Sequence, residues 1–162
     1  MRIERPGPDG EPLPAGVRII RLAVPPKDFH ETGKVSPLTF KLSSKEENES
    51  PPRLSVFAED LTTPPQAAAI LGKPAYTLVA HLEVDQVRAL RPNPDPPGTP
   101  ALDVVWRHIN DCRPGACGHS GITGLNNRLS PVRKRFRAKL ADIAVVTQLE
   151  EWRPPQSALP SA

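Results

Sequence analysis

Hydrophobic and polar positions alternate in several short runs of the chain, and these runs predict β-strands. Residues 36–43 (SPLTFKLS) place Leu38, Phe40 and Leu42 at every second position, which is the period of a half-buried strand. Residues 53–60 (RLSVFAED) show the same alternation. Apolar and β-branched runs predict further strands over residues 17–24, 76–84, 102–106 and 118–125.

A proline-started segment predicts a short helix after the second alternating run. Thr63 can cap this helix, Pro64 occupies its first position, and Gln66 completes a capping box. Gly72 suits the left-handed residue that often ends a helix. The sequence therefore predicts a helix over residues 64–71.

A longer helix is predicted near the C-terminus, from Ser130-Pro131 to about Thr147. Its apolar residues fall on one stripe at helical spacing, namely Val132, Phe136, Leu140, Ile143 and Ala144. A short helical turn is also predicted from Asp85 to Leu90. The order of elements predicts an α+β fold: a single curved, mostly antiparallel sheet on which the capped short helix and the longer C-terminal helix pack.

Proline-rich segments mark the two ends of the predicted domain. Residues 1–16 and 153–162 contain several of the 22 prolines and few residues that could pack in a core. We interpret both segments as disordered tails, which leaves residues 17–152 as one domain.

The composition favours a small protein in a reducing compartment. A net charge of +3 over 162 residues is mildly basic, less than is typical of a dedicated nucleic-acid-binding domain. The N-terminus has no apolar signal region, and no run approaches the roughly 20 apolar residues of a membrane-spanning helix. We therefore expect a cytoplasmic protein that spans no membrane and whose two cysteines are free thiols.

Basic residues are concentrated in and just before the first half of the last helix, where cations oppose the helix dipole. They are Arg128, Arg133, Lys134, Arg135, Arg137 and Lys139. This placement favours an anionic partner such as nucleic acid or an acidic protein surface. A simply solvated helix face is the alternative, and no aromatic residue is interleaved to stack on bases.

The stretch CRPGACGHSG (112–121) brings together residues that bind metals. Cys112, Cys117, His119 and the upstream His108 form a two-thiolate, two-imidazole set that could hold zinc. The four ligands lie within twelve residues, whereas structural zinc sites usually join separate parts of a chain. A redox pair or a plain Gly/Pro turn are the alternatives, and apart from zinc no cofactor is expected.

An arginine on the first strand (Arg18 or Arg21), a serine opening a later strand (Ser55) and a late histidine (His119) form a layout that resembles ADP-ribosyltransferase-like folds. The resemblance implies an arginine that holds NAD and a serine that orders the site. The late carboxylate that such folds usually need is missing from this pattern.

The wider skeleton VSPLTFK…RLSV…LTTP…VAHLEVDQVRAL…LDVVW…PGACGHSGITGL…RAKLADIA resembles a widespread group of bacterial proteins with no assigned activity. The resemblance covers roughly residues 17–147 and implies a shared fold but no function. The His119 position belongs to that pattern, whereas the cysteines do not.

Three hypotheses follow, in order of preference. The first is a non-catalytic binding or accessory module that contacts an anionic partner through the basic helix 130–147. The second is a small enzyme that acts on a nucleotide or NAD-like substrate through Arg21, Ser55 and His119. The third is a zinc-stabilised domain. The sequence does not indicate an oligomeric state.

Overall fold

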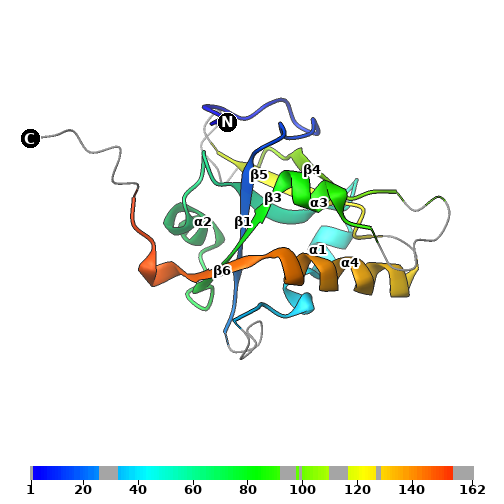
Figure 1. Ribbon diagram of the computed structural model, residues 1–162. Helices are drawn as coiled ribbons and strands as arrows, with labels where there is room; N and C mark the ends of the chain where they lie inside the picture. Colours follow the sequence, from blue (N-terminus) through cyan, green and yellow to red (C-terminus); the bar gives the residue numbers. More distant parts are fainter. Residues whose placement is uncertain are drawn as a thin grey trace, which may run out of the picture.

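The computed structural model describes residues 2–25, 33–91, 98, 100–109, 117–126 and 129–154, and its centre is a single six-stranded sheet (Figure 1). Every neighbouring pair of strands is antiparallel, and the strand order is β4-β5-β2-β1-β3-β6. The strands are β1 (Arg18–Ala23), β2 (Leu54–Ala58), β3 (Leu78–Glu83), β4 (Asp103–Trp106), β5 (His119–Thr123) and β6 (Val145–Gln148).

In the described part of the chain, four α-helices and two 3₁₀ turns surround the sheet. They are η1 (Pro37–Phe40), α1 (Ser44–Glu47), α2 (Pro64–Leu71), α3 (Val84–Ala89), α4 (Ser130–Ile143) and η2 (Leu149–Glu151). This arrangement confirms the predicted α+β class with its short capped helix and longer C-terminal helix. Among the helices of the described segments, none has the length and apolar character needed to cross a membrane.

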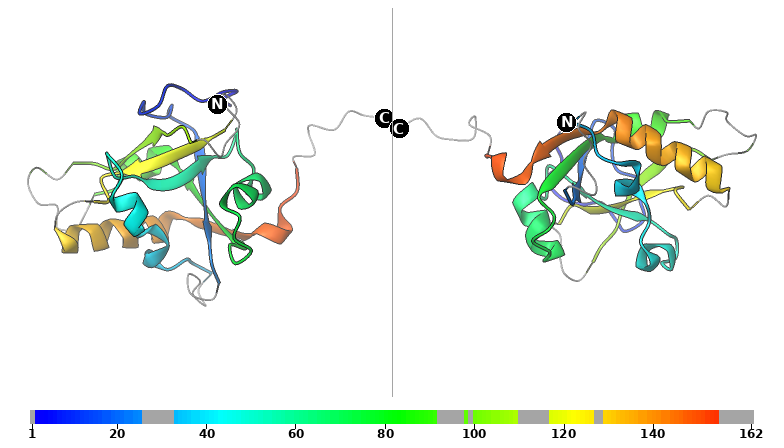
Figure 2. Two further views of the ribbon diagram at one scale, coloured as in Figure 1. Left: turned by 180° about the vertical axis from the view of Figure 1, so that it is seen from behind. Right: turned by 90° about the horizontal axis from the view of Figure 1, so that it is seen from below.

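Strand alternation divides the hydrophobic residues between the two faces of the sheet. On one face Ile19 of β1 belongs to a large core cluster with Phe136 of α4. On the other face Ile20 belongs to a smaller cluster with Ala67 of α2. The two helices therefore cover opposite faces, as the view from below shows (Figure 2).

The local signals of α2 are confirmed in detail. The Thr63 hydroxyl accepts a hydrogen bond from the backbone N–H of Gln66 at 3.3 Å, and the Gln66 side chain accepts one from the Thr63 N–H at 2.9 Å. Pro64 occupies the first turn, and Gly72 ends the helix with φ 65°. This helix could be predicted because its boundaries depend on hydrogen bonds between residues close in sequence.

The predicted strand over residues 36–43 is wrong. Ser36 and Pro37 start the 3₁₀ turn η1 instead, with the Ser36 hydroxyl accepting from the Leu38 N–H at 3.2 Å. Phe40 is fully buried, whereas Leu38 is 54% exposed, so the apparent alternation does not reflect one buried face. A cap followed by proline decided the local structure over the period-2 pattern.

The predicted end of the last helix is also wrong. Helix α4 ends at Ile143, Ala144 is extended, and the following residues form the edge strand β6. In the register of β6, Val145 pairs with His81 and Thr147 with Val79 of β3. The β-branched run after Ala144 favours this extended pairing over another helical turn.

The interpretation of residues 1–16 as a tail outside the domain is wrong for the segment that lies along β4. Gly10 donates its N–H to the Trp106 carbonyl at 2.8 Å, and Leu13 donates to the Val104 carbonyl at 2.9 Å. The Leu13 side chain is 2% exposed and belongs to the main core. Of the predicted C-terminal tail (153–162), residues 155–162 lie outside the described part of the chain.

Because Leu13 is a core residue, Leu13→Ala should lower the free energy of unfolding by about 3 kcal/mol. Urea unfolding followed by circular dichroism would measure the loss. Leu38→Ala is the matched control, since that leucine is 54% exposed, and it should change stability by less than about 1 kcal/mol. Equal effects of the two substitutions would show that the N-terminal segment contributes nothing to the core.

Candidate functional site

The cations of α4 are divided by helical periodicity between two sides of the helix. Val132, Phe136 and Leu140 are buried against the sheet. Arg133 and Arg137, one turn apart, lie beside this buried stripe and line a pocket. The pocket is also lined by Lys134, Lys41, Ser130, Glu47, Phe40, Leu42 and Leu125.

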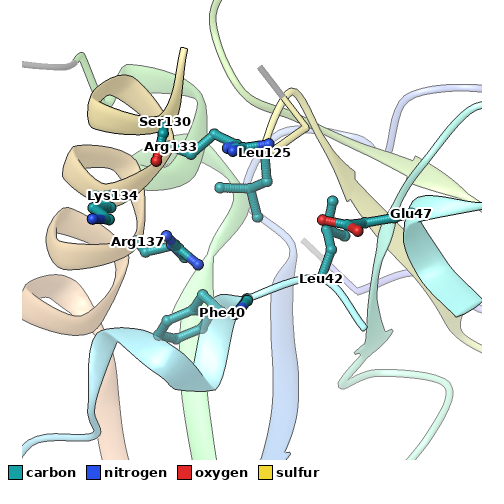
Figure 3. A pocket seen from close by; sticks show the side chains of 9 residues that line it. Phe40, Leu42, Glu47, Leu125, Ser130, Arg133, Lys134 and Arg137 are labelled. Carbon is teal, nitrogen blue, oxygen red and sulfur yellow. The ribbon is translucent and has the colours of Figure 1, made fainter. Parts of the chain in front are cut away.

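The pocket has a volume of about 190 Å³ and lies between α4 and the segment that joins η1 to α1. Figure 3 shows Arg133 and Arg137 on the helix side and Glu47 on the opposite side. Of the described residues that line the pocket, Lys41, Lys134 and the two arginines are cationic, and Glu47 is the single acid. The arrangement concentrates positive charge around one small cavity.

The electrostatics of α4 leave this positive charge poorly compensated. Burial lowers the pKa of Arg137, the charge of Arg133 lowers it further, and Glu47 partly opposes the shift. A guanidinium stays protonated at neutral pH, so both arginines remain charged and repel each other. The first turn of α4 contains no acidic residue, and its N-cap is Leu129, whose side chain makes no capping hydrogen bond. An anion in the pocket would reduce the repulsion between the two arginines and supply the negative charge that the first turn of α4 lacks.

The structure places the other predicted anion-binding residues elsewhere. Arg135 and Lys139, four residues apart on α4, are not among the described residues that line the pocket. Arg128 lies outside the described residues. The six basic residues of the sequence pattern therefore do not form one continuous site in the described part of the chain.

A second constellation, on the face of the sheet that α2 covers, contains two of the predicted catalytic residues. In the register of β2 and β5, Phe57 pairs with His119 and Ser55 with Gly121, so all four share one face. The Ser55 hydroxyl lies 3.3 Å from Nε2 of His119. The Phe57 ring meets the imidazole edge-on, with ring centroids 5.2 Å apart.

Burial and one backbone contact determine the state of His119. Its Nδ1 lies 3.0 Å from the Arg107 carbonyl oxygen, which can only accept, so Nδ1 carries the hydrogen. Burial lowers the pKa of His119 to about 4, and the nearby positive charges of Arg107 and Arg53 lower it as well. The imidazole is therefore neutral near pH 7, with Nε2 accepting the hydrogen of the Ser55 hydroxyl.

Arg21 extends to the same region, but its guanidinium group donates hydrogen bonds to backbone carbonyl oxygens. Strands β1 and β2 pair only at Ile19–Ala58 and Ile20–Phe57, so the backbone of Ser55 is not paired with β1. Nη1 of Arg21 donates to the Ser55 carbonyl at 2.7 Å, and the Ser55 N–H donates to Glu46 Oε2 at 2.7 Å. Arg21 is thus a structural residue with an ion-pair partner, Glu46, at 3.9 Å.

The arginine that shares a face with Ser55 and His119 is Arg53, which the sequence analysis did not select. It is 8% exposed, and its Nη1 donates to the Trp106 carbonyl at 3.2 Å. Its Nε has no hydrogen-bond partner among the described residues. A Cβ on Gly121 would lie 2.5 Å from the Cβ of Arg53, so glycine leaves the room that the arginine needs. Alternation along β2 was the signal that could have identified Arg53.

The space next to Ser55 is small. A cavity of about 40 Å³ is lined there by Arg21, Leu22, Ser55, Phe57, Leu71 and Tyr76. This volume is far below the roughly 300 Å³ at which pockets begin to enclose whole small-molecule ligands. The described residues therefore bring Ser55, His119 and an arginine together without a nucleotide-sized cleft.

The predicted zinc set is not assembled by the described residues. Cys117 is disulfide-bonded, so the expectation of free thiols is wrong for this residue, and its sulfur is no thiolate ligand. Nε2 of His108 contacts the Gly7 carbonyl at 2.8 Å, and both ring nitrogens of His119 have the contacts given above. Cys112 lies outside the described residues, among which no three His, Cys, Asp or Glu side chains form a metal-binding group.

Comparison with known proteins does not assign either site. No family model matches the chain, and neither the curated proteins nor the solved structures contain a match. The resemblance to a group of bacterial proteins therefore stays a prediction.

The neutral state of His119 predicts a loss of stability in acid. The folded protein holds its pKa near 4, whereas the unfolded chain binds the proton near the ordinary value of 6.5. The unfolded state therefore carries more protons between these values, and the stabilising contribution present above pH 6.5 is lost as the pH falls towards 4. The shift corresponds to on the order of 3 kcal/mol.

Urea unfolding at a series of pH values would measure this loss, with His119→Gln as the control that cannot titrate. Glu46 and Glu59 also have lowered pKa values, and both residues are present in the wild type and in the variant. Burial would raise both pKa values, but the Arg21 charge acts against it at Glu46 and a hydrogen bond from His81 acts against it at Glu59. The wild type should lose more stability than the variant between about pH 7 and pH 4.5. Parallel losses would contradict a buried neutral histidine.

Proposed function

We propose that the protein is a non-catalytic binding module that contacts an anionic partner through the first half of α4. The observation that carries the proposal is the pocket in which Lys41, Arg133, Lys134 and Arg137 face a single carboxylate, that of Glu47. Cations from two separate parts of the chain converge there. A merely solvated helix face would not need a lysine from the η1–α1 segment at the same cavity.

The energetic placement of these cations supports the same proposal. Arg133 and Lys134 lie near the N-terminus of α4, where each cation opposes the helix dipole at a cost of a few tenths of a kcal/mol. Arg137 also suffers desolvation and repulsion from Arg133, as its lowered pKa indicates. Folding stability alone therefore does not explain these residues, whereas binding of an anion would offset both costs.

The chemistry of the pocket favours recognition of charge over recognition of bases. Phe40, the aromatic residue among the described lining residues, is fully buried and exposes no ring face for stacking. An acidic group on a protein or a small molecule fits this arrangement better than stacked nucleotides do.

Binding of a fluorescent polyphosphate, measured by anisotropy, should weaken as salt concentration rises, because the interaction is electrostatic. Arg133→Glu/Arg137→Glu should abolish it by replacing two of the four converging cations with repelling charges. Arg91→Glu/Arg153→Glu is the matched control, since it changes net charge equally at exposed positions away from the pocket and should retain most of the binding. A wild type that binds no polyanion even at low salt would reject the proposal.

A small enzyme acting on a nucleotide or NAD-like substrate is the second candidate. One specific observation favours it, the 3.3 Å contact between Ser55 and a buried, neutral His119. The small neighbouring cavity and the engagement of Arg21 by backbone carbonyls count against it. In this reading, Ser55 and His119 would contact the substrate, and Arg53 would supply positive charge beside them.

The enzymatic alternative predicts that the purified protein releases nicotinamide from NAD. Ser55→Ala and His119→Ala should each reduce that rate by about 100-fold or more. Ser44→Ala removes an exposed hydroxyl from α1 and should leave the rate unchanged. Chromatographic assay of nicotinamide would measure the rates, and a wild type without activity would reject this candidate.

A further inference from the structure

We infer that the α4 pocket recognises a phosphate monoester group, with the Glu47 carboxylate acting as a built-in competitor for the same cations. This inference rests on the proposed function, because it names the ligand chemistry of that site. It commits to one compact dianion in the pocket and excludes a long polyanion lying along the whole helix.

The size of the cavity suits a small ligand. Its volume of about 190 Å³ is below the roughly 300–1,000 Å³ of pockets that enclose drug-sized ligands. The cavity can take a phosphate with a small attached group. Stacked bases would find no exposed face of Phe40, the aromatic residue among the described lining residues.

The charge on α4 is divided between the pocket and the rest of the helix surface. Arg133, Lys134 and Arg137 line the pocket together with Lys41, whereas Arg135 and Lys139 are not among its described lining residues. Four cations and one carboxylate give the lining a formal charge of about +3. A phosphate monoester, with a charge of about −1.5 to −2 at neutral pH, compensates this positive charge better than a singly charged carboxylate or phosphodiester does.

The hydrogen-bond donors of the pocket are arranged in a way that suits phosphate oxygens. Arg133 and Arg137 are separated by one helical turn, so their guanidinium groups approach the cavity from one side. Planar guanidinium groups bind phosphate oxygens through paired hydrogen bonds, whereas lysines contribute compact charges. The Ser130 hydroxyl, at the start of the same helix, lines the pocket and offers a further donor.

Glu47 lies where its carboxylate competes with a bound anion. Its side chain faces the arginines across the cavity (Figure 3), and its charge partly restores the pKa of Arg137. Among the described residues, the Glu47 carboxylate forms no ion pair within 4 Å with Arg133 or Arg137, so Glu47 screens the site without closing it. An entering phosphate would have to overcome the repulsion from Glu47. Removal of the Glu47 charge should therefore strengthen phosphate binding.

The test is isothermal titration calorimetry of the full chain with O-phosphoserine at low ionic strength, with serine as the comparison that lacks the phosphate. Glu47→Gln should strengthen O-phosphoserine binding by a factor of about two to five, the effect expected from one partly exposed charge. Arg133→Ala/Arg137→Ala should weaken it by more than about tenfold. Arg135→Ala/Lys139→Ala, which removes the same charge from the same helix, should change it by less than about twofold.

The outcomes separate the inference from the proposed function. If both double variants weaken binding equally, or if an oligonucleotide without a terminal phosphate binds more tightly than O-phosphoserine, the monoester pocket is overturned while anion binding by α4 stands. If the wild type binds neither probe nor polyphosphate, both proposals fail. The gain expected from Glu47→Gln cannot arise from misfolding, and circular dichroism of the double variants would confirm that α4 persists.

Discussion

The bridge from Arg21 and Glu46 to the backbone of Ser55 is the interaction on which both candidate sites depend. Strands β1 and β2 separate after two paired positions, and this bridge satisfies the Ser55 N–H and C=O that the separation leaves without a strand partner. Nε of Arg21 also donates to the Thr39 carbonyl at 2.6 Å, which holds η1. Glu46 belongs to α1, so the same ion pair positions the wall of the α4 pocket and the strand that carries Ser55.

The energetics of this bridge depend on its charges and its hydrogen bonds together. Burial alone would raise the pKa of Glu46, yet the Arg21 charge and the N–H groups of Ser43 and Ser55 outweigh it and lower that pKa. A partly buried ion pair stabilises a fold only when hydrogen bonds compensate for lost solvation. Here Arg21 and Glu46 also bind the backbone C=O and N–H of Ser55, in place of hydrogen bonds between β1 and β2. Arg53, by contrast, is buried with an Nε that lacks a partner among the described residues.

Local sequence signals predicted the elements whose hydrogen bonds are local. Thr63, Pro64 and Gln66 determine the start of α2, and the alternation in β2 reflects one face of a paired strand. The sequence signals were wrong for residues 36–43, where the alternation predicted a strand but Ser36 and Pro37 start a 3₁₀ turn. They also did not indicate the hydrogen bond from the Leu13 N–H to the Val104 carbonyl, because a contact across some ninety positions leaves no periodic pattern in the sequence.

By itself the sequence determined the α+β class, the capped helix α2 and the concentration of cations in α4, because these depend on composition and on neighbours within a few positions. Only the tertiary structure decided which cations from separate segments lie together: it brought Lys41 to the pocket that Arg133 and Arg137 line. It likewise placed Ser55 against His119 and assigned Arg21 to the backbone. Strand register and the packing of η1 against α4 set these distances, and both arise from contacts between residues far apart in the chain.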